Sequence, residues 1–339
     1  MDICNLPKSV ILELTYRCNH NCKFCSSPWL APNSKYPKKQ ELSVEEWKKA
    51  IDILLQNGVE GFTLSGGEVL MKEGFDEILS YIRERSNSLG FTHPIMLISN
   101  GRAMREEYLK LFKELNVHLS MSLPGYETFK ELTGVDNADG VLHWFELSKR
   151  IGLRTTVNIT VTQKNYHELF QTISMGLLSG ADDVLLNRFL PGGRGLAHIS
   201  ELSITPAQVN GMLDTAEEVL SYAHREGNVG IEIPWCSIKA PNKYKRIHVG
   251  YRCSATKAFF VIDPAGQIRV CNHSPRTIGH VFGTPIIEDT DYWNLFATSH
   301  YTPSMCSGCD KNKYCDCGCR EAAHILCGSP TTQDTSIIV

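Results

Sequence analysis

The chain has 339 residues, of which 42% are hydrophobic and 21% charged, so it has enough apolar material for a folded core and is not a disordered protein. Its 34 Lys and Arg residues and 37 Asp and Glu residues leave a formal net charge of −3, which offers no broad positive field for nucleic acid or anionic lipid. No run approaches the roughly 18 apolar residues of a membrane span, and the first residues lack a signal-peptide pattern. We therefore expect a cytoplasmic protein.

The first two thirds of the chain alternates short apolar runs with helical patterns, which is typical of β/α units on a parallel sheet. The first connecting helix is marked by a capping box of Ser43 and Glu46 and by Gly58 at its exit. About six units are predicted. Their strands are expected at residues 10–14, 61–64, 95–98, 117–121, 155–160 and 183–186.

The pattern changes after about residue 200. A helix is predicted over 206–225, and a polar, proline-containing stretch follows at 234–245. The turn tetrapeptide 263–266 predicts a hairpin of two short strands. From Cys306 onward there is too little apolar material for a core, so we expect this part to need metal to hold its shape. The expected domains are a barrel over 1–200, a helical linker over 201–245 and a cysteine-rich domain over 246–339.

Thirteen cysteines are clustered rather than spread, with none between Cys25 and Cys236. In a long chain without a signal peptide, such clusters more often bind metal than form disulfides. The run Cys18-x3-Cys22-x2-Cys25 offers three thiolates, which can hold a four-iron, four-sulfur cluster and leave its fourth iron open to an external ligand. The alternative is a zinc site completed by His20 or a distant residue.

This cysteine motif, with the aromatic Phe24 before its last cysteine and a strand before it, resembles the signature of the radical S-adenosylmethionine (SAM) superfamily. The run Ser65-Gly66-Gly67-Glu68 resembles the family's Gly-Gly-Glu motif, whose backbone and carboxylate receive the methionine amino group. Val69 stands where that family usually has proline. The resemblance also implies SAM contacts at later strand ends, from Ser99, Asn100, Ser120, Ser122, Asn158 and Arg188.

The resemblance implies an α/β fold, a partial (β/α)6 TIM-like barrel followed by a small cysteine-rich iron–sulfur SPASM domain. It implies an oxidoreductase in which one electron from the reduced cluster cleaves SAM to a 5′-deoxyadenosyl radical, which abstracts a hydrogen atom from the substrate. A donor such as flavodoxin or ferredoxin would supply that electron. The run 187–195 resembles a segment common in relatives that bear extra clusters.

Seven later cysteines have the order and spacing of the SPASM domain, which holds two auxiliary four-iron clusters. By analogy, one cluster takes Cys306, Cys309, Cys315 and Cys327. The other takes Cys253, Cys271 and Cys319, with Cys236 favoured as the fourth ligand over an open iron or a hydrogen-donating thiol. Cys4 and Cys317 are left over. A zinc ribbon is the alternative for this whole block.

Auxiliary clusters suggest a net oxidation, so we expect a cross-link, a thioether or a dehydrogenation, installed on a peptide. Recognition of a leader sequence would then need the barrel itself or a separate leader-binding protein. His273, after Cys271, is the candidate base. Two alternatives stay open: a small-metabolite oxidase or decarboxylase in natural-product or tetrapyrrole biosynthesis, and a non-catalytic iron–sulfur electron carrier.

Overall fold

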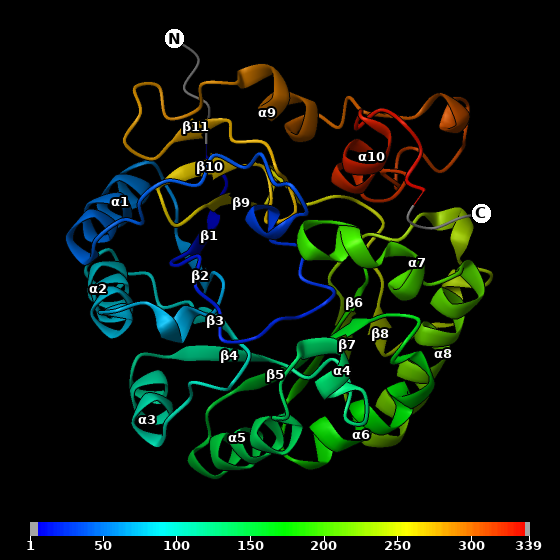
Figure 1. The fold of residues 1–339 in the computed structure, drawn as a ribbon, viewed down its shortest axis with the longest axis horizontal. Coiled ribbons are helices and arrows are strands. Elements are labelled where there is room, and N and C mark those ends of the chain that lie inside the picture. The colour runs from blue at the N-terminus through cyan, green and yellow to red at the C-terminus, as the bar shows by residue number, and fades with distance from the viewer. Residues whose placement is uncertain (1–5, 336–339) are drawn as a thin grey trace.

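One continuous sheet organises the chain in the computed structural model, which describes residues 6–335 (Figure 1). Its order over the described residues is β11-β10-β9-β1-β2-β3-β4-β5-β6-β7-β8. All neighbours from β9 to β8 pair in parallel, whereas β10 and β11 are antiparallel. The strands are β1 Ser9–Glu13, β2 Gly61–Ser65, β3 Ile95–Ser99, β4 Val117–Ser122, β5 Thr155–Val161, β6 Asp183–Arg188, β7 Gly227–Val229, β8 Ile247–His248, β9 Phe259–Ile262, β10 Gln267–Arg269 and β11 Gly279–His280.

Helices surround the curved parallel strands, as Figure 1 shows from a view into the ring of strands. The hydrophobic core lies between the ring of strands and the surrounding helices. Helix α1, for example, buries Trp47, Ala50 and Ile51 in this core. The predicted capping box is confirmed, because Ser43 and Glu46 bond reciprocally at the start of α1. The helices are α1 Val44–Gln56, α2 Phe75–Ser88, α3 Glu106–Glu114, α4 Phe129–Thr133, α5 Ala138–Ile151, α6 Leu169–Leu178, α7 Ile199–Leu202, α8 Pro206–Ala223, α9 Thr290–Ala297 and α10 Arg320–Cys327.

The six strands predicted for the barrel are confirmed within one or two residues at each end, and so is the hairpin of β9 and β10. Two further short strands, β7 and β8, extend the sheet beyond β6. They have three and two residues, too few to show an alternating pattern in the sequence. Both β7 and α8 fall in the segment expected as a linker, and the division into three domains stays a prediction.

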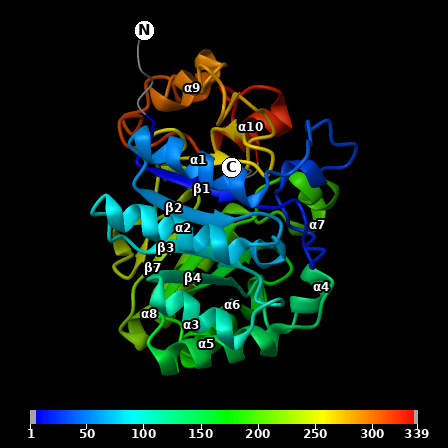
Figure 2. The same cartoon turned by 90° about the vertical axis from the view of Figure 1, so that its left-hand side faces the viewer.

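The C-terminal part is joined to the barrel through β9, which pairs with β1 in register from Ser9 opposite Phe259. Side chains reinforce this join. Asp263 accepts hydrogen bonds from the hydroxyls of Tyr16 (3.1 Å) and Tyr36 (2.7 Å), and buried Arg269 forms an ion pair with Glu13. In Figure 2 the C-terminal elements α9 and α10 cover the β1 end of the barrel. None of the described helices is both long and apolar enough to cross a membrane.

Candidate active site

The first cysteine loop follows β1 and crosses the end of the ring of strands, where parallel barrels place their sites (Figure 1). Its backbone is fixed on one side by α4, because the N–H groups of Asn21 and Lys23 each donate a 2.8 Å hydrogen bond to carbonyls at the end of that helix. On the other side, Arg194 Nη1 donates to the Cys22 carbonyl at 3.0 Å. A Cβ at Gly193 would lie 2.4 Å from the Ser27 carbonyl oxygen, so only glycine fits this approach.

The three thiols of this loop suit a cluster rather than one ion. Cys18, Cys22 and Cys25 are all free. No three His, Cys, Asp or Glu side chains within residues 6–335 are close enough to hold a single metal ion, as the zinc alternative with His20 would require. Burial raises the pKa of the Cys22 thiol, and the neighbouring charges of Cys25 and Cys18 raise it further. Three neighbouring thiolates that repel one another are the donor set that a cationic iron cluster compensates.

The Gly-Gly-Glu run packs directly on the residues that precede the cysteine loop. The Gly67 N–H donates to the Thr15 carbonyl at 2.7 Å, and the Glu68 N–H donates to the Arg17 carbonyl at 2.8 Å. A Cβ at Gly67 would lie 2.2 Å from the Arg17 carbonyl oxygen. A glycine at position 67 therefore allows the chain's own backbone, at Arg17, to approach closely.

Glu68 is buried and links two strand ends. Its carboxylate accepts hydrogen bonds from Ser99 Oγ (2.7 Å) and from the backbone N–H of Asn100 (2.8 Å). Burial raises the pKa of Glu68, and these hydrogen bonds oppose the shift. The Asn100 side chain in turn donates to Cys18 Sγ at 3.8 Å. The structure thus brings Glu68, Ser99 and Asn100 together beside the first cysteine, and their predicted contacts with SAM stay a prediction.

A cavity of about 340 Å³, the barrel cavity, opens beside Cys25. Four of the predicted site residues line it, namely Cys25, Ser122, Arg188 and His273. Asn158 does not line the cavity, but it accepts a 2.9 Å hydrogen bond from Asn187, which does. The full lining is Phe24, Cys25, Ser26, Ile98, Ser122, Thr160, Asn187, Arg188, Leu190, Gly230, Ile231, Asn272 and His273.

Four polar residues of this lining were not predicted as site residues, namely Ser26, Thr160, Asn187 and Asn272. Thr160 is two residues from Asn158 and so shares its face of β5, which is a signal that the sequence contained. Ser120, one strand away on β4, is buried, and its Oγ has no hydrogen-bond partner among the described residues. A buried hydroxyl without a partner is costly, so Ser120 fits a position that a bound ligand would satisfy.

Arg188 has a fully buried side chain, and its Nη2 lies 2.7 Å from Asp334 Oδ2. The same carboxylate oxygen accepts a 2.8 Å hydrogen bond from the Cys319 N–H. Arg188 therefore connects the wall of the barrel cavity to the C-terminal segment. Its predicted contact with a SAM ribose or carboxylate stays a prediction.

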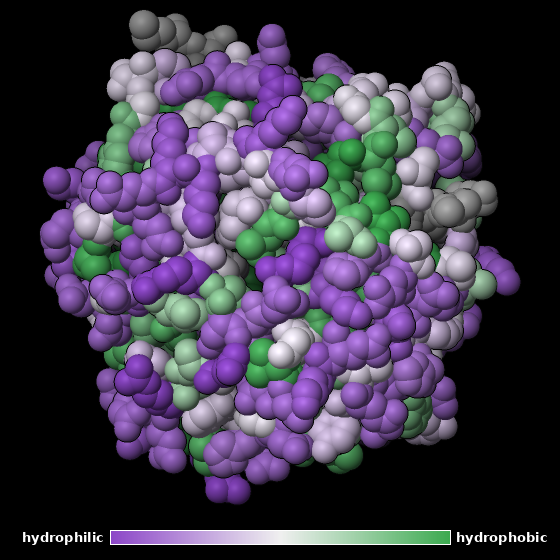
Figure 3. Space-filling view, viewed as in Figure 1, coloured by the Kyte–Doolittle hydropathy of each residue, from purple (hydrophilic) through white to green (hydrophobic). Residues whose placement is uncertain are grey.

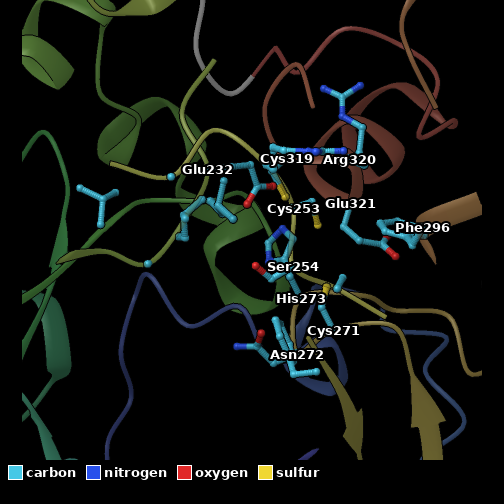
Figure 4. A pocket seen from close by; sticks show the side chains of 18 residues that line it. Glu232, Cys253, Ser254, Cys271, Asn272, His273, Phe296, Cys319, Arg320 and Glu321 are labelled. Carbon is cyan, nitrogen blue, oxygen red and sulfur yellow. The ribbon is translucent and has the colours of Figure 1, made fainter. Parts of the chain in front are cut away.

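A second cavity, which we call the inner cysteine cavity, has a volume of about 170 Å³ and contains Cys253, Cys271 and Cys319 (Figure 4). It shares one wall with the barrel cavity, formed by Leu190, Gly230, Ile231, Asn272 and His273. His273 is only 6% exposed, and its Nε2 has no hydrogen-bond partner within the described residues. Burial lowers the pKa of His273 to about 4.

A third cavity, the outer cysteine cavity, has a volume of about 100 Å³ and is lined by five cysteines. Backbone N–H groups of Trp235 and Cys317 lie 3.5 and 3.3 Å from Cys315 Sγ. On the face shown in Figure 3, hydrophobic atoms gather over the cysteine-rich part beside α10. The five cysteines are Cys236, Cys306, Cys309, Cys315 and Cys317.

This grouping differs from two of the predicted ligand assignments, which stay predictions. Cys236, expected beside Cys253, lies with Cys306 in the outer cavity. Cys327, expected there, lines neither cysteine cavity as the structure describes them, and its Sγ is 3.8 Å from Thr335 Oγ1. Helix α10 begins directly after Cys319 of the inner cavity and ends at Cys327. Cys4 lies outside the described residues.

Comparisons with known proteins agree with this geometry. Residues 12–175 match the family model described as the Radical SAM superfamily. The chain contains a radical SAM domain. As a radical SAM enzyme, it uses S-adenosylmethionine and a four-iron, four-sulfur cluster.

Similar radical SAM proteins cover nearly the whole chain. The PqqA peptide cyclase of Bradyrhizobium diazoefficiens is 24% identical over 344 residues, which cover 97% of this chain and 85% of that protein. The PqqA peptide cyclase of Xanthomonas euvesicatoria is 25% identical and covers 98% of this chain and 88% of that protein.

Solved structures confirm the predicted fold class. Streptococcus suis SuiB bound to precursor peptide SuiA has a TM-score of 0.72 at 15% identity, covering 99% of this chain and 76% of that one. Native anSMEcpe with bound AdoMet has a TM-score of 0.71 at 16% identity, covering 97% of this chain and 92% of that one. The radical SAM partial barrel with its cysteine-rich C-terminal part is therefore the fold of this chain.

Proposed function

We propose that this radical SAM enzyme oxidatively modifies a peptide and that its two cysteine cavities hold auxiliary four-iron clusters. One observation carries the proposal: the barrel cavity beside Cys25 and the inner cysteine cavity share a wall of five residues. A substrate held in the barrel cavity would therefore lie next to a second redox centre. Such a centre can accept the electron that a net oxidation releases.

The chain's own residues would bind and orient the cofactors. When bound, the first cluster and SAM supply the one-electron chemistry that removes a hydrogen atom from the substrate. Cys18, Cys22 and Cys25 would hold the cluster. Glu68 would present its remaining acceptor positions to the methionine amino group, at a place fixed by Ser99 and Asn100. The other proposed SAM contacts come from Ser65, Gly66, Gly67, Ser120, Ser122, Asn158 and Arg188.

The two auxiliary sites would form a route for the electron from the barrel to the surface. Cys253, Cys271 and Cys319 of the inner site are half-buried or buried, whereas Cys236 and Cys309 of the outer site are exposed. The outer site is thus accessible to a redox protein such as flavodoxin or ferredoxin. His273, the predicted catalytic residue, stands in the wall between substrate and inner site.

The peptide substrate is supported by the relatives. The curated relatives are named PqqA peptide cyclases, and SuiB was crystallised with a precursor peptide. An oxidative change in a peptide, such as a cross-link, a thioether or a dehydrogenation, agrees with the electron-accepting sites. If a leader sequence is needed, a separate leader-binding protein or the barrel itself would recognise it.

The test is anaerobic reconstitution followed by turnover with a short peptide encoded beside the gene. Three cubane clusters would give about twelve irons per chain. We expect 5′-deoxyadenosine to form and the peptide to lose about two mass units, as removal of two hydrogen atoms requires. Release of 5′-deoxyadenosine with turnover of a small metabolite and an unchanged peptide would reject the peptide substrate. A reducible protein that forms no 5′-deoxyadenosine would favour an electron carrier.

A further inference from the structure

The inner cysteine cavity has one thiol fewer than a closed four-iron site needs. Cys253, Cys271 and Cys319 line it, and Cys236, the cysteine expected to complete the set, lies in the outer cavity instead. A carboxylate or an imidazole can replace a thiolate as a metal ligand. Three side chains in this cavity carry such a group, namely Glu232, Glu321 and His273.

Two of these three are less suited to the position. The carboxylate of Glu321 is occupied, since it accepts a 2.8 Å hydrogen bond from the Tyr292 hydroxyl and lies 3.2 Å from His324 Nδ1. His273 stands in the wall shared with the barrel cavity, where it faces the proposed substrate space.

Glu232 differs from both. Within the part of the chain that the structure describes, its carboxylate has a hydrogen bond only from its own backbone N–H, and the charges that act on it are those of Arg188, Asp334 and Arg320. Figure 4 shows this carboxylate pointing toward the sulfur atoms of Cys253 and Cys319. Glu232, Cys253 and Cys319 line the same cavity.

The backbone around Glu232 is held in place on both sides. The Gly230 N–H donates to the Leu186 carbonyl at 2.9 Å, and the Ile233 N–H donates to the Gly250 carbonyl at 3.0 Å. Glu232 is therefore on a short segment tied to β6 on one side and to the start of the C-terminal part on the other. A ligand on such a segment is presented at a fixed position rather than on a free loop.

We propose that the Glu232 carboxylate is the fourth protein ligand of the inner site, completing a three-thiolate, one-carboxylate set with Cys253, Cys271 and Cys319. This inference rests on the proposed auxiliary clusters and adds to them the identity of the ligand. A carboxylate is a harder ligand than a thiolate and binds iron less tightly in a cluster. The iron that it holds is then the one most readily lost or exchanged.

The test uses the full chain with Cys18, Cys22 and Cys25 changed to alanine, so that only auxiliary clusters form. Glu232→Ala, Glu232→Gln and Glu232→Cys are made in this background, with Glu321→Gln as the matched control from the same cavity. Each protein is reconstituted anaerobically and treated briefly with a mild one-electron oxidant. Iron per chain and the electron paramagnetic resonance spectrum are then measured.

The parent is expected to keep about eight irons, as two cubanes require. Glu232→Ala and Glu232→Gln should lose about one iron per chain and show the signal of a three-iron cluster, while Glu232→Cys and Glu321→Gln should keep the parent content. Because Glu232→Gln preserves the side-chain shape, a folding failure in the alanine variant leaves the test intact.

A parent-like spectrum and iron content in Glu232→Gln would overturn the ligand assignment. A His273→Ala variant is made in the same background. If it loses iron while the Glu232 variants do not, the assignment to Glu232 is also overturned. A parent with only about four irons would instead overturn the two auxiliary clusters themselves, and the ligand with them, before any change at Glu232.

Discussion

The carboxylate of Glu68 and the backbone N–H of Asn100 are joined by a 2.8 Å hydrogen bond that connects the ends of β2 and β3. The Asn100 side chain extends the connection to Cys18 through a 3.8 Å contact with its sulfur. The residue proposed to bind the methionine amino group and the first cluster ligand therefore share one hydrogen-bonded unit. A substitution of Glu68 should therefore affect cofactor binding more than the stability of the fold.

Glu68→Gln is expected to weaken SAM binding about tenfold or more, because a hydrogen bond to a charged group contributes about 1.5–3 kcal/mol and tenfold corresponds to about 1.4 kcal/mol. Equilibrium binding of SAM to the anaerobically reconstituted protein measures this. The control is Glu60→Gln, which removes a carboxylate that pairs with exposed Lys8 and should change little. Unchanged affinity in Glu68→Gln, with iron content equal to wild type, would contradict the assigned role.

Gly67→Ala should lower the free energy of unfolding by about 1–3 kcal/mol or more, as overpacking typically does. The added Cβ would lie 2.2 Å from the Arg17 carbonyl oxygen, and backbone atoms cannot move aside as a flexible side chain can. Gly250→Ala is the matched control, because its Cβ would meet nothing within 4 Å. Urea denaturation of both variants gives the comparison. Equal midpoints would show that the strand ends are more adaptable than this packing indicates.

The barrel could be predicted from the sequence because each strand and helix is a local pattern. The run before Cys18 and the capping box at Ser43 each depend on residues near in sequence, and both were confirmed. The partition of the late cysteines could not be predicted, since it depends on where α10 carries Cys327 and where the loop at Cys236 packs. Those are long-range relations that spacing does not encode. The carboxylate of Glu232 likewise had no motif around it.

Cys236 and Cys327 should differ in reactivity once the clusters are formed. Both thiols are exposed and free, but only Cys236 lines the outer cysteine cavity with Cys306 and Cys309. A thiolate bound to iron is unavailable to an alkylating reagent. We therefore expect iodoacetamide to label Cys327 but not Cys236 in the reconstituted protein, and both in the metal-free protein, as mapped by mass spectrometry.

The matching variants add an independent measurement. Cys236→Ser should reduce the iron content of the outer site, whereas Cys327→Ser should leave it at the wild-type value. The reverse pattern, with Cys327 protected and required, would restore the ligand order expected from the spacing of the cysteines and would mean that the cavity at Cys236 has another purpose.

His118 on β4 should make stability depend on pH. It is buried, and its Nε2 lies 2.7 Å from Thr156 Oγ1. Burial, and then the positive charge of Arg154, lowers the pKa of His118 below its usual 6.5. The unfolded chain therefore binds a proton at a higher pH than the folded chain does. The stability that depends on a neutral His118 is fully present above pH 6.5 and is lost as the pH falls below that value.

His118→Gln keeps a hydrogen-bonding side chain of similar size but cannot titrate. Between pH 7 and pH 5 the wild type should lose stability faster than this variant, with a difference of up to about 1.4 kcal/mol per pH unit for one proton. Urea midpoints measured on the metal-free forms of both proteins across that range isolate the histidine, because all other titrating groups are shared. Parallel pH profiles would mean that His118 is protonated in the folded protein at no cost in stability. The carboxylate of Asp183, 3.7 Å away, would then stabilise the charged imidazole.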